Sequence, residues 1–132
     1  MKLQGLRVED SQIAEADGLM KLVAIAAAAA AVILQLVQAR DGCSRQPASN
    51  AFRDPEIAVL EVLNDRIEGK TLLQKNPHPK TSMRWAAWIV GRLGGWDGYP
   101  SSRKPGPITM RNGLKRLSVL AEGWSLRDLC MP

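Results

Sequence analysis

The chain has 132 residues, a formal net charge of +5 and two cysteines. This length accommodates one modest domain, or a domain with an appended element. Cys43 and Cys130 have no paired spacing and no secretory signal precedes them, so we expect reduced thiols in a cytoplasmic protein rather than a disulfide framework.

The charge is unevenly distributed along the chain. Residues 1–68 contain 7 Lys/Arg and 10 Asp/Glu, whereas residues 69–132 contain 11 and 3. A basic half of this kind favours a polyanionic partner such as DNA. Charge alone is equally compatible with a surface that only keeps the protein soluble.

Residues 12–40 are predicted to form one long helix, after a short polar segment in which Gly5 is a local breaker. Ser11 is a suitable N-cap, acids occupy the first turns, Arg40 lies in the last turn and Gly42 follows as a stop. Alanine, which has the highest helix propensity, dominates the middle of the segment.

The apolar run from Leu22 to Leu34 is thirteen residues without interruption, which is too short to span a bilayer. The acids before it have the wrong sign for a signal peptide. We therefore predict a buried helix and no membrane contact. A helix that is apolar on nearly every side belongs inside a larger structure, and nothing else in the chain is obviously large enough to surround it.

Residues 41–53 form a loop rich in Ser, Gly, Pro and Asn, which is the clearest internal boundary. The run Asp54-Pro55-Glu56 then predicts the start of a second helix, with a capping acid and proline at the first helical position. Gly69 is predicted to end this helix, and residues 70–80 form a basic linker broken by prolines. The predicted buried face contains Ile57, Leu60, Leu63 and Ile67.

Residues 83–120 predict a helical hairpin. Steps of three and four place Trp85, Trp88, Ile89 and Arg92 on one side of its first helix. Gly94-Gly95 ends that helix. Pro105-Gly106-Pro107 makes a stiff turn, and Thr109 is a suitable N-cap for the next helix. No segment predicts a strand, so the expected fold is all-α with about four helices, the first of them long and apolar.

The segment WAAWIVGRLGGWDGYPSSRKPGPITMRNGL, residues 85–114, resembles the C-terminal dimerisation region of bacterial insertion-sequence transposases of the transposon-five-like group. The resemblance extends upstream through residues 75–79 (KNPHP), 68–71 (EGKT) and 57–61 (IAVLE), and more loosely to Gly5-Leu6. It therefore covers nearly all of the chain. Members of this family are cut-and-paste enzymes with an RNase H-like core and three catalytic carboxylates.

The resemblance implies a domain organisation. Residues 1–42 would be the tail of the catalytic domain, 43–53 a loop, 54–126 the helical dimerisation domain and 127–132 a C-terminal tail. In the family the metal-binding carboxylates lie upstream of a Lys that Lys2 matches, so no acid of this chain is expected to inherit their role. Full-length relatives use Mg²⁺, but no cofactor is expected for this chain.

Basic residues supply the predicted contacts with DNA phosphates. Lys2 is included because it matches the family's phosphate-contact signature. Lysines in flexible linkers are often only solvated, so the remaining members are candidates on charge. The predicted set is Lys2, Lys70, Lys75, Lys80, Arg84, Arg103 and Lys104, and the last helix adds Arg111, Lys115 and Arg116.

The last helix also carries an apolar stripe that we predict to pair two copies of the chain, centred on Leu117. Gly113 beside the stripe would allow two helices to approach closely across a twofold axis, and relatives in the resembled family pair through this region. We interpret Trp85 and Trp88 as packing residues and leave the roles of Trp96 and Tyr99 open. The predicted stripe is Met110, Leu114, Leu117, Ala121 and Trp124.

No metal site is predicted. His78, the only histidine, lies between two prolines and is interpreted as a turn residue, since no ligand spacing accompanies it. A dyad of His78 with Cys43 or Cys130 has no support in spacing. The acids Glu9, Asp10, Glu15 and Asp17 are explained by the helix dipole more simply than by a metal cluster.

The expected function is that of a truncated transposase that retains homodimerisation and auxiliary contact with transposon-end DNA. It would pair with itself or with a full-length transposase and would not cut or join DNA. One alternative is a free-standing basic helical module that binds DNA or regulates another protein. A small helical enzyme is a third, for which no catalytic constellation is found.

Overall fold

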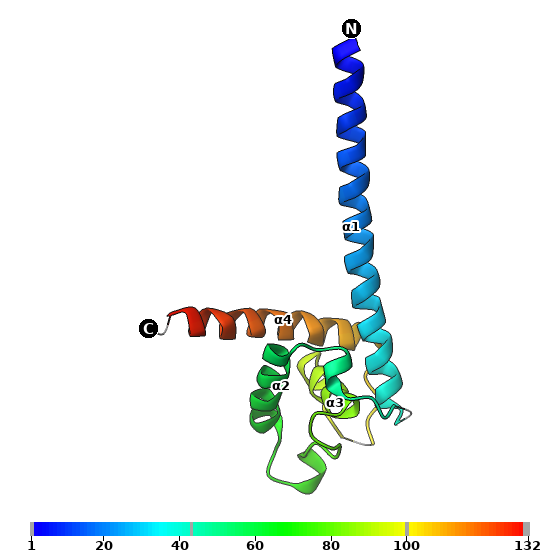
Figure 1. The fold of residues 1–132 in the computed structure, drawn as a ribbon. Coiled ribbons are helices and arrows are strands. Elements are labelled where there is room, and N and C mark those ends of the chain that lie inside the picture. The colour runs from blue at the N-terminus through cyan, green and yellow to red at the C-terminus, as the bar shows by residue number, and fades with distance from the viewer. Residues whose placement is uncertain (1, 43, 100, 131–132) are drawn as a thin grey trace. The chain divides into compact units, whose positions relative to one another are not determined.

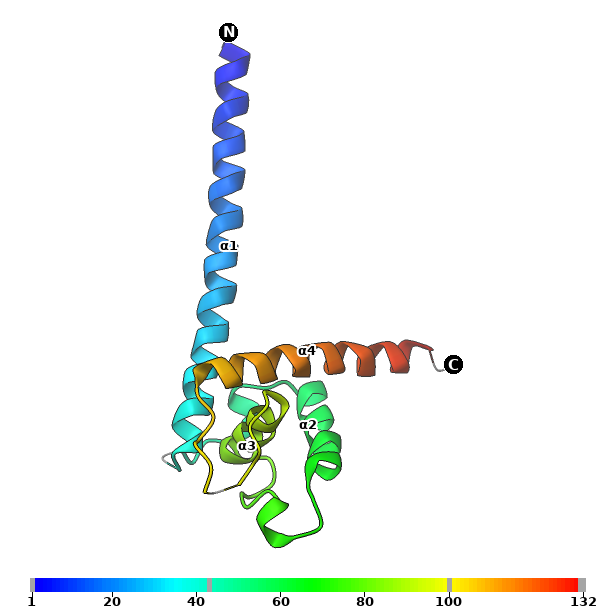
Figure 2. The same cartoon turned by 180° about the vertical axis from the view of Figure 1, so that it is seen from behind.

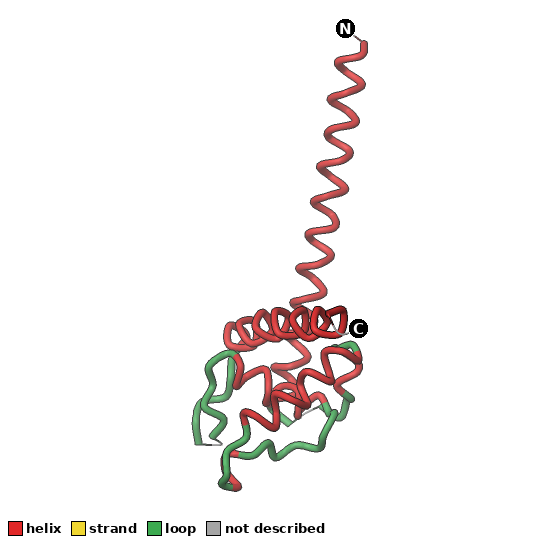
Figure 3. Tube along the Cα trace, turned by 90° about the vertical axis from the view of Figure 1, so that its left-hand side faces the viewer, coloured by secondary structure: helices red, strands yellow, loops and turns green. Residues whose placement is uncertain are grey.

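The computed structural model describes residues 2–42, 44–99 and 101–130, with the side chains of 12–126 within these ranges. The prediction of an all-α fold is confirmed: the described residues contain four α-helices and no strand (Figure 3). The helices are α1 (Lys2–Arg40), α2 (Asp54–Ile67), α3 (Met83–Leu93) and α4 (Pro107–Cys130), with short 3₁₀ turns η1 (Ala48–Asn50) and η2 (Leu72–Gln74).

The chain divides into two compact units, Met1–Val32 and Ile33–Pro132. The boundary lies inside α1 rather than at the predicted loop 43–53. The last turns of α1 belong to the second unit, where Leu36 and Ala39 are fully buried. Similarly, α4 continues to Cys130, beyond the predicted domain end at residue 126.

Helix α1 begins earlier than predicted. It starts at Lys2 rather than Gln12, so Ser11 is a helical residue and not an N-cap, and Gly5 does not break the helix. A glycine inside a helix costs only about 1 kcal/mol, which the surrounding helix formers offset. The predicted stop is confirmed, because Gly42 has φ +80° and its N–H donates to the Ala39 carbonyl at 3.0 Å.

This chain alone does not bury α1 over most of its length, and burial in a larger structure stays a prediction. The apolar side chains of α1 are exposed throughout residues 12–31, including Leu22 at 65% and Ile25 at 67%. The segment Gln12–Arg40 is long and apolar enough to cross a membrane by length and composition. Core helices of soluble proteins and signal sequences share that length and composition, so the finding does not by itself assign the helix to a bilayer.

The second unit is built around α3 (Figures 1 and 2). Every residue from Trp85 to Gly91 is buried, so α3 is a central helix rather than the one-sided amphipathic helix that the sequence predicted. Helices α2 and α4 and the turn η1 pack against it. The interior is completed by Phe52, Val59, Leu60, Met110 and Leu117.

Helix α2 begins one residue earlier than predicted: Arg53 is the N-cap, so Asp54 is the first helical residue and Pro55 the second. The backbone N–H of Arg53 donates to Glu56 Oε1 at 3.1 Å, which satisfies a group left over at the helix start. Its buried residues are Val59, Leu60 and Asn64. The predicted residues Ile57, Leu63 and Ile67 are only half-buried, so the buried face is rotated from the one expected.

The predicted glycine stop of α3 is confirmed. Gly95 has φ +109°, its N–H donates to the Arg92 carbonyl at 3.1 Å, and the Trp96 N–H donates to the Gly91 carbonyl at 3.0 Å. This pair of bonds is the Schellman motif, in which a residue of positive φ follows the helix end. The motif turns the chain back so that Trp96 lies over the helix it has just left.

Helices α3 and α4 cross at two points of very close approach. A Cβ added at Gly113 would lie 2.0 Å from the Val90 carbonyl oxygen, and one added at Gly94 would lie 2.0 Å from the Thr109 carbonyl oxygen. The missing side chain at Gly113 therefore allows the close approach of α3 of the same chain, rather than of a second copy. Thr109 is not the N-cap, because α4 begins at Pro107 and the Met110 N–H donates to the Gly106 carbonyl at 3.0 Å.

This crossing predicts opposite effects for two glycines of the same helix. Gly113→Ala should lower the free energy of unfolding by about 3 kcal/mol or more, because backbone must move to relieve the overlap. Gly123→Ala should raise it by about 0.5–1 kcal/mol through helix propensity alone, since no atom lies within 4 Å of the added Cβ. Urea unfolding followed by tryptophan fluorescence measures both, since all four tryptophans lie in the second unit. Equal stabilities for the two variants would contradict this account of the crossing.

Candidate nucleic-acid interface

The predicted DNA-contacting cations lie on three parts of the second unit. Lys70, Lys75 and Lys80 are exposed on the connection between α2 and α3. Arg84 is half-buried on the first turn of α3, and Arg103 and Lys104 are exposed in the loop before α4. The remaining member, Lys2, lies outside the described side chains.

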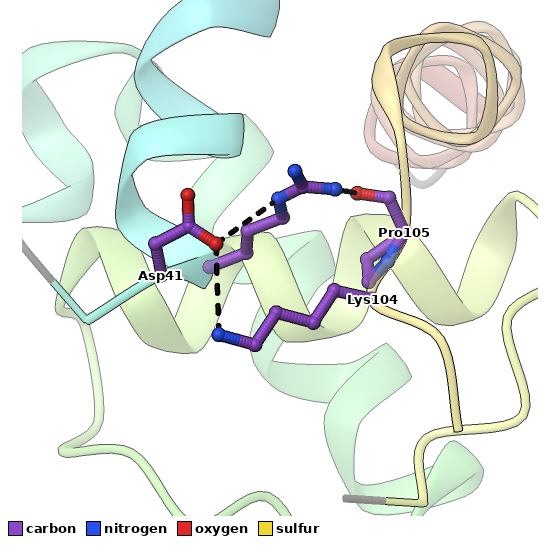
Figure 4. A network of polar contacts seen from close by, with 4 residues as sticks. Asp41, Lys104 and Pro105 are labelled. Atoms are coloured by element: carbon purple, nitrogen blue, oxygen red, sulfur yellow. Dashed lines mark hydrogen bonds and ion pairs between the residues drawn. The ribbon is translucent and has the colours of Figure 1, made fainter. Parts of the chain in front are cut away.

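Lys104 belongs to a small network at the end of α1 (Figure 4). Its Nζ lies 3.6 Å from Asp41 Oδ1, and the same oxygen lies 3.4 Å from Arg40 Nε. Arg40 Nη1 also donates to the Pro105 carbonyl. The network ties the last turn of α1 to the loop before α4, so Lys104 has a structural contact as well as an exposed ammonium group.

The cations of α4 are more available. Arg111, Lys115 and Arg116 are exposed, and none of them takes part in the ion pairs formed by the described side chains. Arg111 and Lys115 are four residues apart and therefore share one side of the helix. Arg111 and Lys115 therefore form an open cationic surface on one side of α4 that phosphates can reach, and Arg103 is exposed in the loop before the helix.

A buried polar cluster, which sequence reasoning missed, holds the connection between α2 and α3. Asn76 Nδ2 donates to Asn64 Oδ1 at 3.1 Å and to the Trp85 carbonyl at 3.2 Å, and its backbone N–H donates to Glu68 Oε2 at 3.3 Å. Asn64 Nδ2 donates in turn to Glu68 Oε1. The available signal was Asn64 itself, a polar residue four positions after the buried Leu60.

The cluster also positions His78. The backbone N–H of His78 donates to Asn76 Oδ1 at 3.1 Å, which agrees with its interpretation as a turn residue. Partial burial lowers the pKa of His78 below 6.5, and the positive charge of Arg84 lowers it further. The imidazole is therefore neutral near pH 7, and it lies beside an arginine rather than beside a carboxylate.

The loop between α3 and α4 is organised by Asp97. Its carboxylate accepts hydrogen bonds from the Ser102 hydroxyl at 2.6 Å and the Tyr99 N–H at 3.0 Å, which lower the pKa of Asp97. Its carbonyl accepts a hydrogen bond from Arg92, which also donates to the Ile67 carbonyl at 3.4 Å. Arg92 thus braces α3 against both the loop and the end of α2.

The aromatic residues of this region pack rather than project. Trp85 and Trp88 are buried as predicted. Trp96 packs edge-on against Trp88, with ring centroids 6.4 Å apart and an interplanar angle of 82°. Arg92 lies 5.7 Å from the Trp88 ring centroid. Tyr99 is 38% exposed, and its hydroxyl accepts a hydrogen bond from Gln74 at 3.2 Å.

The predicted dimerisation stripe is only partly accessible. Met110 and Leu117 are 0% and 1% exposed, because they are part of the core of their own chain. Leu114, Ala121 and Trp124 are half-buried. The exposed apolar residues of α4 lie at other positions: Ile108, Val119, Leu120 and Leu126.

Among the described residues, no group of three or more His, Cys, Asp or Glu side chains is placed to hold a metal ion. Asp17 forms an exposed ion pair with Lys21 at 3.4 Å. The side chains of Glu9, Asp10, Cys43 and Cys130 lie outside the described residues.

No family model, curated protein or solved structure matches this chain.

The environment of His78 gives a prediction about its titration. Its pKa, measured from the imidazole proton shifts by NMR, should lie below 6.5 in the folded protein. Arg84→Gln should raise it part of the way back, because burial remains after the charge is removed. Below pH 6.5 the unfolded chain takes up this proton more readily than the folded one, so folding stability should fall as the pH falls. A pKa that is unchanged by Arg84→Gln would contradict the assigned cause.

Proposed function

We propose that this chain is the C-terminal part of an insertion-sequence transposase, which lacks the catalytic carboxylates and acts through auxiliary DNA contact and self-association. The family resemblance of residues 85–114 and of the segments upstream supports this proposal. No catalytic activity is proposed, since no acid of the chain matches a catalytic carboxylate of the resembled family. Cytoplasmic localisation and transposon-end DNA as the ligand belong to the same proposal.

One observation carries the DNA-contact part of the proposal. Arg111 and Lys115 form an exposed cationic surface on one side of α4 and take part in none of the ion pairs formed by the described side chains, and Arg103 and Arg116 are exposed nearby in the sequence. Each phosphate neutralised by such a cation releases a condensed counterion into bulk solution. This release favours binding, most strongly at low salt, and needs no contact with the bases. An unpaired surface of this kind is expected to bind duplex DNA with little sequence preference.

The alternative is a free-standing basic helical module that binds DNA or regulates a different protein. The second unit supports this alternative, because residues 33–132 contain a core of their own centred on α3. Both proposals require the cationic surface. They differ in the partner: only the first expects the chain to assemble with a full-length transposase of the resembled family, which co-purification of the two proteins would show.

The DNA proposal predicts a steep salt dependence that two residues reduce. Log affinity for duplex DNA should fall linearly with log salt, and Arg111→Gln with Lys115→Gln should make the slope shallower by about 2. Arg45→Gln with Arg66→Gln is the matched control, since it removes the same charge from exposed residues outside this surface. Fluorescence anisotropy at several salt concentrations measures both. An affinity that does not change with salt, or equal slopes for the two double variants, would contradict the proposal.

The self-association proposal now centres on the exposed side of α4. Leu93, Val119 and Leu120 line an apolar depression there, with Lys115 and Arg116 at its edge. Val119 is 68% exposed, so it can be changed without opening the core, unlike Leu117. The resembled family pairs through this region, which supports a second copy of the chain as the occupant.

Light scattering during size-exclusion chromatography tests this. The chain is expected to be dimeric at tens of micromolar, and Val119→Glu should shift it toward the monomer by placing a charge in the contact. Leu73→Glu is the control, since Leu73 is exposed on η2 and far from α4 in sequence. A monomeric parent chain would end the proposal, and an equally dimeric Val119→Glu variant would place the contact elsewhere.

A further inference from the structure

A cavity of about 230 Å³ lies in the second unit between α3, the connection that precedes it and the loop that follows it. Its walls are mainly apolar. Ala87 and Trp88 contribute from α3, and Trp96 and Pro105 contribute from the loop. The edge-on packing of Trp96 against Trp88 sets two aromatic surfaces nearly at right angles.

The polar part of the cavity is cationic. Arg84, Arg40 and Lys104 line it from three different segments, together with His78, and none of its lining residues is acidic. Asp41 pairs with Arg40 and Lys104 but does not line the cavity. An excess of positive charge therefore remains around a largely apolar space, which favours an anionic ligand.

Arg84 is the most available cation of the cavity. It is half-buried and takes part in none of the ion pairs formed by the described side chains, whereas Arg40 and Lys104 both pair with Asp41. Three N–H groups of the lining residues, Nε of Arg40, Nε of Arg84 and Nε1 of Trp96, are fully buried and have no hydrogen-bond partner. Because these three atoms are closed to the cavity, a ligand meets Arg84 through the rest of its guanidinium group, which favours a ligand that brings acceptor oxygens and negative charge.

We infer that this cavity binds a nucleoside phosphate, whose phosphate accepts hydrogen bonds from the Arg84 guanidinium and whose base lies against the tryptophan walls. Guanidinium groups match phosphate oxygens in geometry and charge, and aromatic side chains bind bases of any sequence by stacking. The volume of about 230 Å³ equals that of roughly eight water molecules. It holds the phosphate and one ring and leaves the rest of the nucleotide at the mouth.

This site goes beyond the proposed contact with duplex DNA. Its residues Trp88, Trp96 and His78 lie outside the exposed cationic surface, and Arg111 and Lys115 do not line the cavity. The ligand can come from two sources with the same chemistry, a free mononucleotide or the 5′-phosphorylated end of a DNA strand. The two sources are separated by competition rather than by geometry.

Isothermal titration of the full chain with deoxyadenosine monophosphate tests the inference. The nucleotide should bind at least about tenfold more tightly than deoxyadenosine or inorganic phosphate, because only the nucleotide uses both halves of the cavity. Arg84→Gln should weaken nucleotide binding by about tenfold or more, through loss of a charge-assisted hydrogen bond. Trp96→Leu should also weaken binding, since it keeps an apolar side chain but removes an aromatic wall of the cavity. Arg66→Gln, an exposed charge change on α2, should leave the affinity unchanged, and circular dichroism checks that each variant is folded.

A 5′-phosphorylated oligonucleotide that competes with the nucleotide, while its unphosphorylated form does not, would identify a strand end as the ligand. Failure of both to compete would identify a free nucleotide, and either result upholds the site. No binding at millimolar nucleotide, equal binding of inorganic phosphate, or unchanged affinity in folded Arg84→Gln and Trp96→Leu would overturn it. Loss of the salt-dependent duplex binding with nucleotide binding intact would remove only the proposed DNA contact.

Discussion

Helices α3 and α4 approach so closely that the backbone of each occupies the space a side chain would take on the other. Gly113 lies against the Val90 carbonyl and Gly94 against the Thr109 carbonyl, each with room for a hydrogen atom but not for a methyl group. Two contacts fix the crossing where one would leave a pivot. The crossing also buries Met110 and Leu117 of α4 beside α3. These two residues of the predicted dimerisation stripe therefore pack inside their own chain.

The same crossing determines the course of the loop that joins the two helices. The Schellman motif at Gly95 sends the chain back over α3, where Gly91 leaves room for Trp96 and Pro105. Asp97 and Arg92 then hold the loop to the ends of α2 and α3. A loop folded back in this way places an indole and a proline opposite the cations of neighbouring segments. The cavity of about 230 Å³ is therefore a consequence of how the hairpin closes.

Local sequence signals predicted the elements well and their environments poorly. The positions of glycine and proline predicted the ends of α1 and α3 and, closely, the start of α2, because these residues restrict or free the backbone of their own segment. Burial depends on which elements meet, which a single stretch does not encode. Sequence reasoning therefore gave α3 a single packed side, whereas every residue from Trp85 to Gly91 is buried. It also predicted that Gly113 contacts a second copy of the chain, whereas Gly113 lies against Val90 of the same chain. The cluster around Asn76 and the grouping of Arg84 with Trp96 join segments far apart in sequence, so neither could be predicted from spacing.

The apolar side chains of α1 raise the question of which kind of surface covers them. The uninterrupted apolar run Leu22–Leu34 is about 20 Å long at 1.5 Å per residue, shorter than the hydrocarbon core of about 30 Å. Extending the span toward the N-terminus includes Lys21 and Asp17, whose exposed ion pair lies at 3.4 Å. Extending it toward Arg40 includes Leu36 and Ala39, which already pack in the second unit. Protein therefore covers the last turns of the helix, whereas the length and composition of the helix fit either a bilayer or a protein surface over its remaining apolar side chains.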